Sequence, residues 1–159
     1  MQKHLFDCWG VKQVADCHYN TCVANVAALL KNREAGARLW TAKSIQDECG
    51  PVREDNGKSN VGTIGAALSY LEGATDRRRS TTFANFKDAR VPGDYAIFMN
   101  AHVVYGIIEA DGSALVLDAN VGRAWQSWAE FLAYAKTNKT LYGADPERLN
   151  QAFRLIPEG

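Results

Sequence analysis

Cys22 is the residue whose type and surroundings most favour nucleophilic chemistry. It follows Asn20 and Thr21, which favour helix starts, and it opens the segment CVANVAALLKN, whose apolar residues recur at helical spacing. A helix N-terminus stabilises a thiolate through its positive dipole end and its N–H groups. The same N–H groups help to bind an oxyanion when a second donor lies nearby, and Gln13, Asn20 and Thr21 are the candidates. The alternative for Cys22 is a small buried apolar residue at a helix start.

A cysteine nucleophile needs a histidine to accept its proton and a third group to orient that histidine. Of the three histidines, only His102 begins a strong strand pattern, HVVYGII. After the polar segment EADGS the chain returns as ALVLD, which ends at Asp118. The alternatives are a half-buried structural histidine and an ordinary turn aspartate. The order Cys22, His102, Asp118 predicts a catalytic triad, provided that the hairpin brings its last two members together.

The register of this hairpin decides whether His102 and Asp118 share a face. A two-residue Asp-Gly loop would place Asp118 opposite Tyr105, on the other face from His102. A three-residue loop over 110–112, with its glycine left-handed in a G1 bulge, places Asp118 opposite Val104. His102 and Asp118 are then diagonal neighbours with backbones roughly 7–8 Å apart, a gap that their side chains can close.

The elements that must position these residues change in type along the chain. Helical patterns come first, over about 22–33, 44–49 and 61–71. Strand patterns follow in STTFANF, DYAIFM, HVVYGII and SALVLD. A capping box at Ser127 predicts a helix over 128–138, and Asp145-Pro146-Glu147 begins a last helical turn. Helices followed by an antiparallel sheet indicate an α+β fold, and residues 1–159 are expected to form a single domain.

The composition argues against several classes of protein. The 18 Lys and Arg residues balance 18 Asp and Glu residues, so no basic surface for nucleic acid is expected. No apolar run approaches the roughly 18 residues of a membrane span, and the N-terminal segment lacks a signal-peptide core, so we expect cytoplasmic synthesis. Cys8, Cys17, His18 and Cys22 lack a C-x-x-C pair, which disfavours zinc; a Cys8–Cys17 disulfide is equally disfavoured. We expect no metal and no cofactor.

Two segments carry a family resemblance. NTCVANVAALL resembles the active-site helix of papain-like cysteine peptidases, in which the cysteine starts a long helix of small and apolar residues. The segment AHVVYGIIEADGSALVLDANVGRAWQSWAEFLAYA is similar to the His and Asp region of the YopT/AvrPphB family of bacterial effector cysteine peptidases. In that family the Asp lies in a D-x-N-x-G motif before an aromatic-rich helix. Residues 118–122 fit this motif, and Phe131 and Tyr134 fit the helix.

The resemblance implies Cys22 as the nucleophile, His102 as the general base and Asp118 as the residue that orients it. It also implies a papain-like fold, with N-terminal helices and the nucleophile helix packed on a C-terminal antiparallel sheet. Papain carries an oxyanion glutamine a few residues before its cysteine. Here Gln13 lies nine residues before Cys22 and four before Cys17, so Cys17 stays a second candidate nucleophile.

The expected activity is hydrolysis of an amide bond in a target protein or peptide, through a thioester intermediate. Glutamine deamidation and proteolysis share this first step, and the short chain disfavours an extended groove with several pockets, which favours a deamidase or amidase. The resemblance implies an effector or toxin with a role in virulence, delivered to a host or target cell by a specialised secretion system. The alternatives are a peptidoglycan amidase, a double-glycine-type peptidase and an inactive papain-like binding module.

Overall fold

The computed structural model describes residues 5–11, 20–50, 63–83 and 85–158. These residues form an α+β arrangement in which helices pack against a six-stranded antiparallel sheet. The strands stand in the order β1-β6-β2-β3-β4-β5. Their bounds are Arg77–Phe83 (β1), Gly93–Met99 (β2), His102–Ile108 (β3), Ala114–Asp118 (β4), Arg123–Trp125 (β5) and Gln151–Pro157 (β6).

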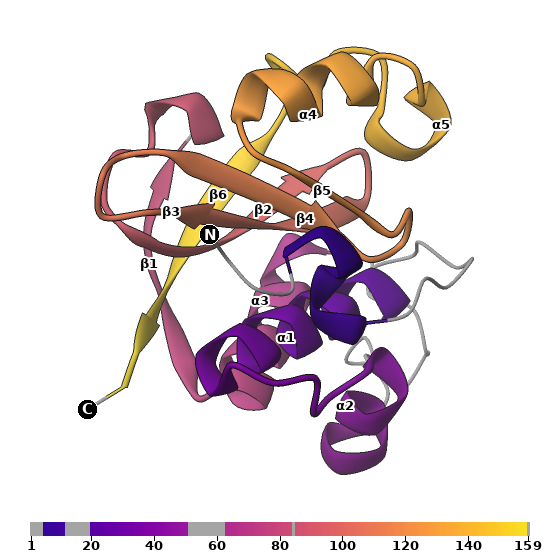
Figure 1. Cartoon of the computed structure of the whole chain (residues 1–159), viewed down its shortest axis with the longest axis vertical. Helices are drawn as coiled ribbons and strands as arrows, with labels where there is room; N and C mark the ends of the chain where they lie inside the picture. Colours follow the sequence, from indigo (N-terminus) through magenta and orange to yellow (C-terminus); the bar gives the residue numbers. More distant parts are fainter. Residues whose placement is uncertain (1–4, 12–19, 51–62, 84, 159) are drawn as a thin grey trace.

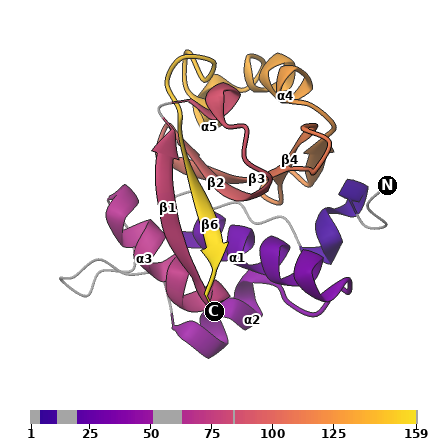
Figure 2. The ribbon, with the colours of Figure 1, turned by 90° about the vertical axis from the view of Figure 1, so that its left-hand side faces the viewer.

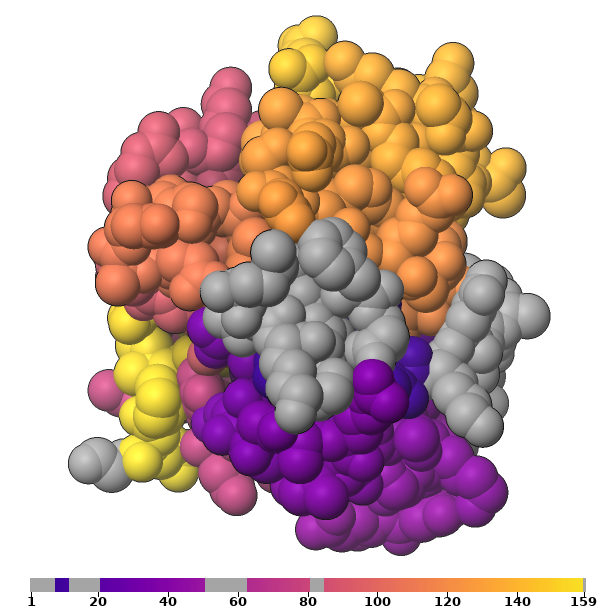
Figure 3. All heavy atoms as spheres, viewed as in Figure 1, coloured from indigo at the N-terminus to yellow at the C-terminus, as the bar shows by residue number. Residues whose placement is uncertain are grey.

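Helices cover both faces of the sheet. Figures 1 and 2 show α1, α2 and α3 on one face and α4 and α5 on the other. In the space-filling view of Figure 3, the purple atoms of α1 and α2 lie below and the orange atoms of the C-terminal helical region lie above. The helix bounds are Asn20–Ala35 (α1), Ala42–Cys49 (α2), Ile64–Thr75 (α3), Trp128–Ala135 (α4) and Lys139–Tyr142 (α5), with 3-10 helices at Leu5–Gly10 (η1) and Phe86–Asp88 (η2).

Each face of the sheet has its own apolar core, because successive strand residues point to opposite sides. In β3, Val103 and Tyr105 belong to the core beside α1, whereas Val104 belongs to the core beside α4. Every residue from 22 to 30 of α1 is buried, since η1, α2, α3 and β3 surround this helix. None of the helices described is both long and apolar enough to cross a membrane.

The three predicted N-terminal helices are confirmed, with different bounds. Helix α1 contains the whole predicted range 22–33. Helix α2 begins earlier than predicted because Thr41 caps it in a reciprocal capping box. Helix α3 begins after its cap at Thr63 and continues past Gly73, because packing on the sheet outweighs the low helix propensity of glycine. Residues 51–62, between α2 and α3, lie outside the described residues.

The strands that were predicted are confirmed, but two strands of the sheet were not predicted. Strand β1 begins earlier than expected, at Arg77, and ends before a 3-10 helix at Phe86. Helix α4 ends at Ala135, and Asn138 caps the unexpected α5. The predicted helical turn at 145–147 is a single turn that leads into β6. The short strand β5 and the C-terminal strand β6, which inserts between β1 and β2, were not predicted.

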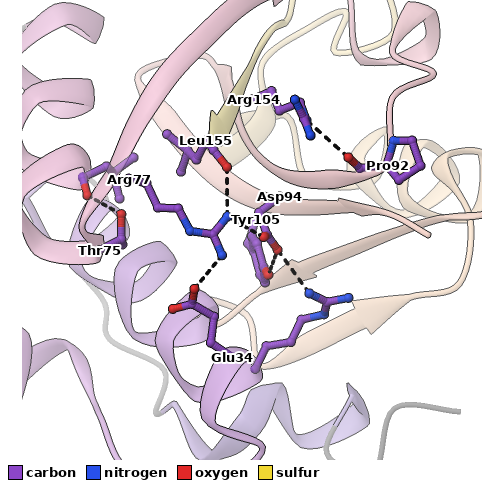
Figure 4. Close-up of polar contacts among 10 residues, drawn as sticks. Glu34, Thr75, Arg77, Pro92, Asp94, Tyr105, Arg154 and Leu155 are labelled. Carbon is purple, nitrogen blue, oxygen red and sulfur yellow. Dashed lines mark hydrogen bonds and ion pairs between the residues drawn. The ribbon is translucent and has the colours of Figure 1, made fainter. Parts of the chain in front are cut away.

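A buried cluster of charges ties the end of α1 to the sheet (Figure 4). Arg77 of β1 donates through Nη1 to Oδ2 of Asp94 over 2.8 Å and through Nη2 to Oε2 of Glu34 over 2.6 Å. Arg33 donates to the other oxygen of Asp94 over 3.3 Å, and the Tyr105 hydroxyl donates to the same oxygen. Arg77 and Asp94 are each 5% exposed. One buried carboxylate therefore connects α1, β1 and β3 to β2.

We expect Arg77→Ala to destabilise the fold strongly, because it leaves the Asp94 carboxylate buried with only part of its compensating charge. Removing one partner of a buried ion pair costs about 3–5 kcal/mol. Urea denaturation should therefore show a loss of about 3–5 kcal/mol in the free energy of unfolding.

Arg79→Ala is the matched control on the same strand. Arg79 pairs with Glu72 over 2.7 Å, but these two side chains are 37% and 27% exposed. A pair with this much solvent contact contributes about 1 kcal/mol or less. Equal destabilisation by the two variants would contradict a special role for the buried cluster.

Candidate active site

The β3–β4 hairpin has the register that places His102 and Asp118 on one face. Its loop has three residues between Glu109 and Ser113, and Gly112 has a φ of 88°, the left-handed conformation of a G1 bulge. The residue pairs of the hairpin place Asp118 level with Val104. The three-residue loop, rather than the two-residue alternative, is therefore confirmed.

The carboxylate of Asp118 holds the imidazole of His102. Nε2 of His102 donates to Oδ2 of Asp118 over 2.7 Å, and the two residues are 0% and 2% exposed. The main-chain N–H of Asn120 donates to Oδ1 over 2.9 Å. The hydroxyl of Tyr142 in α5 donates to Oδ2 over 2.7 Å, and its ring packs edge-on against the imidazole. These three donors satisfy the buried carboxylate and fix its orientation.

Cys22 approaches the same imidazole from α1. It lies in the first turn of the helix and is fully buried. Its thiol lies close enough to His102 to help raise the pKa of the imidazole. Because Asp118 engages Nε2, the thiol is left with Nδ1, which has no well-aligned hydrogen bond to a described group. The contact is therefore a loose one, as catalytic hydrogen bonds often are before substrate binds.

Opposing effects set the charge of His102. Burial has the largest single effect and lowers its pKa, because the protein interior solvates an imidazolium poorly. The charge and hydrogen bond of Asp118, followed by those of Cys22, outweigh burial and raise the pKa of His102 from 6.5 to about 10. At neutral pH the imidazole is therefore charged, with the Asp118 carboxylate on one side and the sulfur of Cys22 on the other.

A second set of contacts joins α1 to the turn that carries Asp118. Asn25 lies one helical turn after Cys22, and its Nδ2 donates to Oδ1 of Asn120 over 2.9 Å. Both amide side chains are buried. Because the N–H of Asn120 binds Asp118, this chain of hydrogen bonds links the helix of the thiol to the carboxylate of the site.

The other residues predicted for the site are described only in part or not at all. Gln13, Cys17 and His18 lie outside the described residues, so the oxyanion glutamine and the second candidate nucleophile stay predictions. Asn20 and Thr21 are the first residues of α1; Thr21 is partly exposed, and the side chain of Asn20 is not described. In the described ranges, no group of three or more His, Cys, Asp or Glu side chains is placed to hold a metal ion.

Sequence reasoning missed Tyr142, Asn25 and Cys8. Tyr142 lies 24 residues beyond Asp118, in a four-residue helix that no local pattern indicates. Asn25 gave a usable signal, because it is the one polar residue within CVANVAALL, and a buried polar side chain needs a partner. Cys8 of η1 donates to the main-chain oxygen of Arg123 over 3.3 Å, so it packs against the turn that follows Asp118.

A cavity of about 300 Å³ adjoins the site without including it. Met99, one of its lining residues, pairs with His102 across the β2–β3 hairpin. The triad residues do not line it. The lining residues are Ile64, Phe98, Met99, Asn100, Arg148, Leu149, Asn150 and Gln151.

The arrangement can carry out proton transfer between sulfur and imidazole beside a helix start. The N–H groups in the first turn of an α-helix have no acceptor within the helix, so those near Cys22 can donate to an oxyanion.

Comparisons with known proteins add no family: no protein-family model matches this sequence, and no curated protein matches it.

The stability of the fold should depend on the charge of His102. Its pKa is 6.5 in the unfolded chain and about 10 in the fold, so the native state binds the extra proton between these values. The stabilisation is complete below pH 6.5 and is lost as the pH rises toward 10. We expect the stability advantage of wild type over His102→Gln to decrease with pH in this window, by at most about 1.4 kcal/mol per pH unit.

Urea denaturation of both proteins at a series of pH values measures this difference. Subtracting the variant removes titrations that do not involve His102. An advantage that stays constant or grows toward alkaline pH would contradict a charged imidazole in the native state.

Proposed function

We propose that the protein is a cysteine-dependent hydrolase with a papain-like fold that acts on amide bonds through Cys22, His102 and Asp118. The observation that carries the proposal is the 2.7 Å bond between His102 Nε2 and Asp118 Oδ2, with Cys22 interacting with the same imidazole. The helix layer that carries the thiol and the antiparallel sheet that carries the other two residues support the papain-like resemblance. The order Cys, His, Asp along the chain supports it further.

The first half of the proposed reaction forms a thioester. In the resting site the Cys22 thiol has already given its proton to Nδ1 of His102, which leaves the imidazole charged, and the sulfur attacks the carbonyl carbon of the amide. The electron pair of the C=O bond moves to oxygen, where N–H groups at the start of α1 bind the oxyanion. As the C–N bond breaks, the imidazolium gives its proton to the departing nitrogen. Asp118 orients the ring and stabilises its charged form.

The second half restores the enzyme. His102 accepts a proton from water while the water oxygen attacks the thioester carbonyl. The carbon–sulfur bond breaks, the product leaves as a carboxylic acid, and the proton taken from water stays on His102 beside the sulfur of Cys22, as in the resting site. Ammonia leaves in the first half when the substrate is a glutamine side chain, and an amine leaves when it is a peptide bond.

The enclosure of the site favours a single amide group over a long peptide as the substrate. Cys22 and His102 are 0% exposed, so the reacting carbonyl must enter a confined space. A side-chain amide of a target protein meets this requirement with fewer contacts than an extended backbone. We therefore place protein-glutamine deamidation first and proteolysis second, in an effector or toxin that acts on a host or target-cell protein.

The reactivity of Cys22 is the first test. The described thiols include two internal references: Cys8 is also buried but contacts main-chain oxygens, and Cys49 is exposed. At neutral pH, iodoacetamide should modify Cys22 faster than Cys8, because His102 takes up the thiol proton. In His102→Ala the rate at Cys22 should fall by at least about tenfold, with Cys49 unchanged. Peptide mass spectrometry measures all three rates in one sample.

Either of two results would count against an enzyme. Modification of Cys22 at the same rate in wild type and His102→Ala would show that the imidazole does not activate the thiol. Modification of Cys22 no faster than Cys8 in wild type would favour the inactive binding module. Circular dichroism of His102→Ala confirms that a lost rate does not reflect a lost fold.

The products of the reaction separate the substrate classes. We expect lysate proteins incubated with wild type, but not with Cys22→Ala, to contain a glutamate in place of a glutamine. Mass spectrometry would detect new chain termini if the protein is a protease instead. Release of muropeptides from purified cell wall would identify a peptidoglycan amidase and overturn the assignment to a protein substrate.

A further inference from the structure

Tyr142 makes a contact to the site that the proposed reaction does not use. Its hydroxyl and Nε2 of His102 donate to the same oxygen, Oδ2 of Asp118, each over 2.7 Å. The other oxygen, Oδ1, is held by the N–H of Asn120. Tyr142 is 1% exposed, and its ring packs edge-on against the rings of His102 and Phe131.

The helix that carries Tyr142 is fixed to the turn that precedes His102. Nδ2 of Asn100, in the turn between β2 and β3, donates to the main-chain oxygens of Thr140 and Leu141 over 3.1 and 3.3 Å. These two residues directly precede Tyr142 in α5. The hydroxyl and the imidazole are therefore held by neighbouring backbone segments as well as by Asp118.

We propose that Tyr142 is a positioning residue of the candidate active site, whose hydroxyl fixes the Asp118 carboxylate against His102 and takes up part of the charge on Oδ2. A hydrogen bond to an ionised carboxylate stabilises its charge and so leaves less of that charge for a second donor. The catalytic meaning of this inference rests on the proposed function. Its physical content, a shared acceptor oxygen, can be measured without a substrate.

Several titratable groups pack against the His102 imidazole. Asp118 faces it from β4, Cys22 from α1 and Tyr142 from α5. The thiol of Cys8 in η1 contacts the main-chain oxygen of Asp118 at 3.9 Å and not the carboxylate. Tyr142→Phe keeps the ring and its packing and removes one hydroxyl from this set.

The titration of His102 in Tyr142→Phe tests the proposal. Without the hydroxyl, the negative charge on Oδ2 stabilises the imidazolium more strongly. The titration midpoint of His102 should therefore rise by about half a pH unit. NMR of protein with labelled histidine measures the midpoint, and the His102 signal is identified by its absence from His102→Gln. An unchanged or lowered midpoint would overturn the proposal, because it would show that the hydroxyl does not compete with the imidazolium for the charge on Oδ2.

Tyr95→Phe is the matched control. The Tyr95 hydroxyl is buried in the same core and donates over 2.6 Å to the main-chain oxygen of Val91. This variant should lose stability to a similar extent and leave the midpoint of His102 unchanged. An equal shift in both variants would show a general effect of lost hydroxyls and would contradict a specific role for Tyr142.

A fluorinated tyrosine at position 142 keeps the proposal testable where the phenylalanine variant folds poorly. Fluorine makes the hydroxyl a stronger donor, so the midpoint of His102 should fall rather than rise. A midpoint that does not fall would contradict the shared oxygen. These outcomes are separate from those of the proposed function, which fails when Cys22 modification does not depend on His102.

Discussion

One extra loop residue decides which face of the sheet carries Asp118. Strand residues alternate between faces, so a shift of one residue in the β3–β4 pairing would turn the carboxylate away from His102. Gly112 makes the three-residue loop possible, because its φ of 88° is strained for other residues. Without the carboxylate, burial would hold the imidazole neutral. The charge of the site therefore originates in the geometry of a surface turn.

Helix α1 meets this hairpin because it is held along its length. At its end, Glu34 and Arg33 contact the buried charge cluster. Near its start, Asn25 binds Asn120 beside the carboxylate of Asp118. In addition, every residue from 22 to 30 is buried. A helix fixed in this way holds Cys22 at one position relative to His102, which is the condition for efficient transfer of a proton.

The parts of the fold that could be predicted are those that local sequence determines. Turn chemistry limits the hairpin to two registers, between which the structure decides, and periodicity specifies α1 and the strands on either side of the turn. Strand β6 was missed because its partners β1 and β2 lie far away in sequence, and its burial depends on them. Tyr142 was missed for the same reason, since a four-residue helix is stabilised by its tertiary contacts rather than by propensity.

Burial makes the site dependent on the whole tertiary structure. Desolvation alone favours a neutral His102, and only groups from other segments reverse that preference. Asp118 comes from β4, Cys22 from α1, and the hydroxyl that shares Oδ2 from α5. Separation of either helical layer from the sheet would therefore remove a partner of the imidazole and leave a weaker proton acceptor beside the thiol. The reactivity of Cys22 and the packing of both layers thus depend on the same contacts.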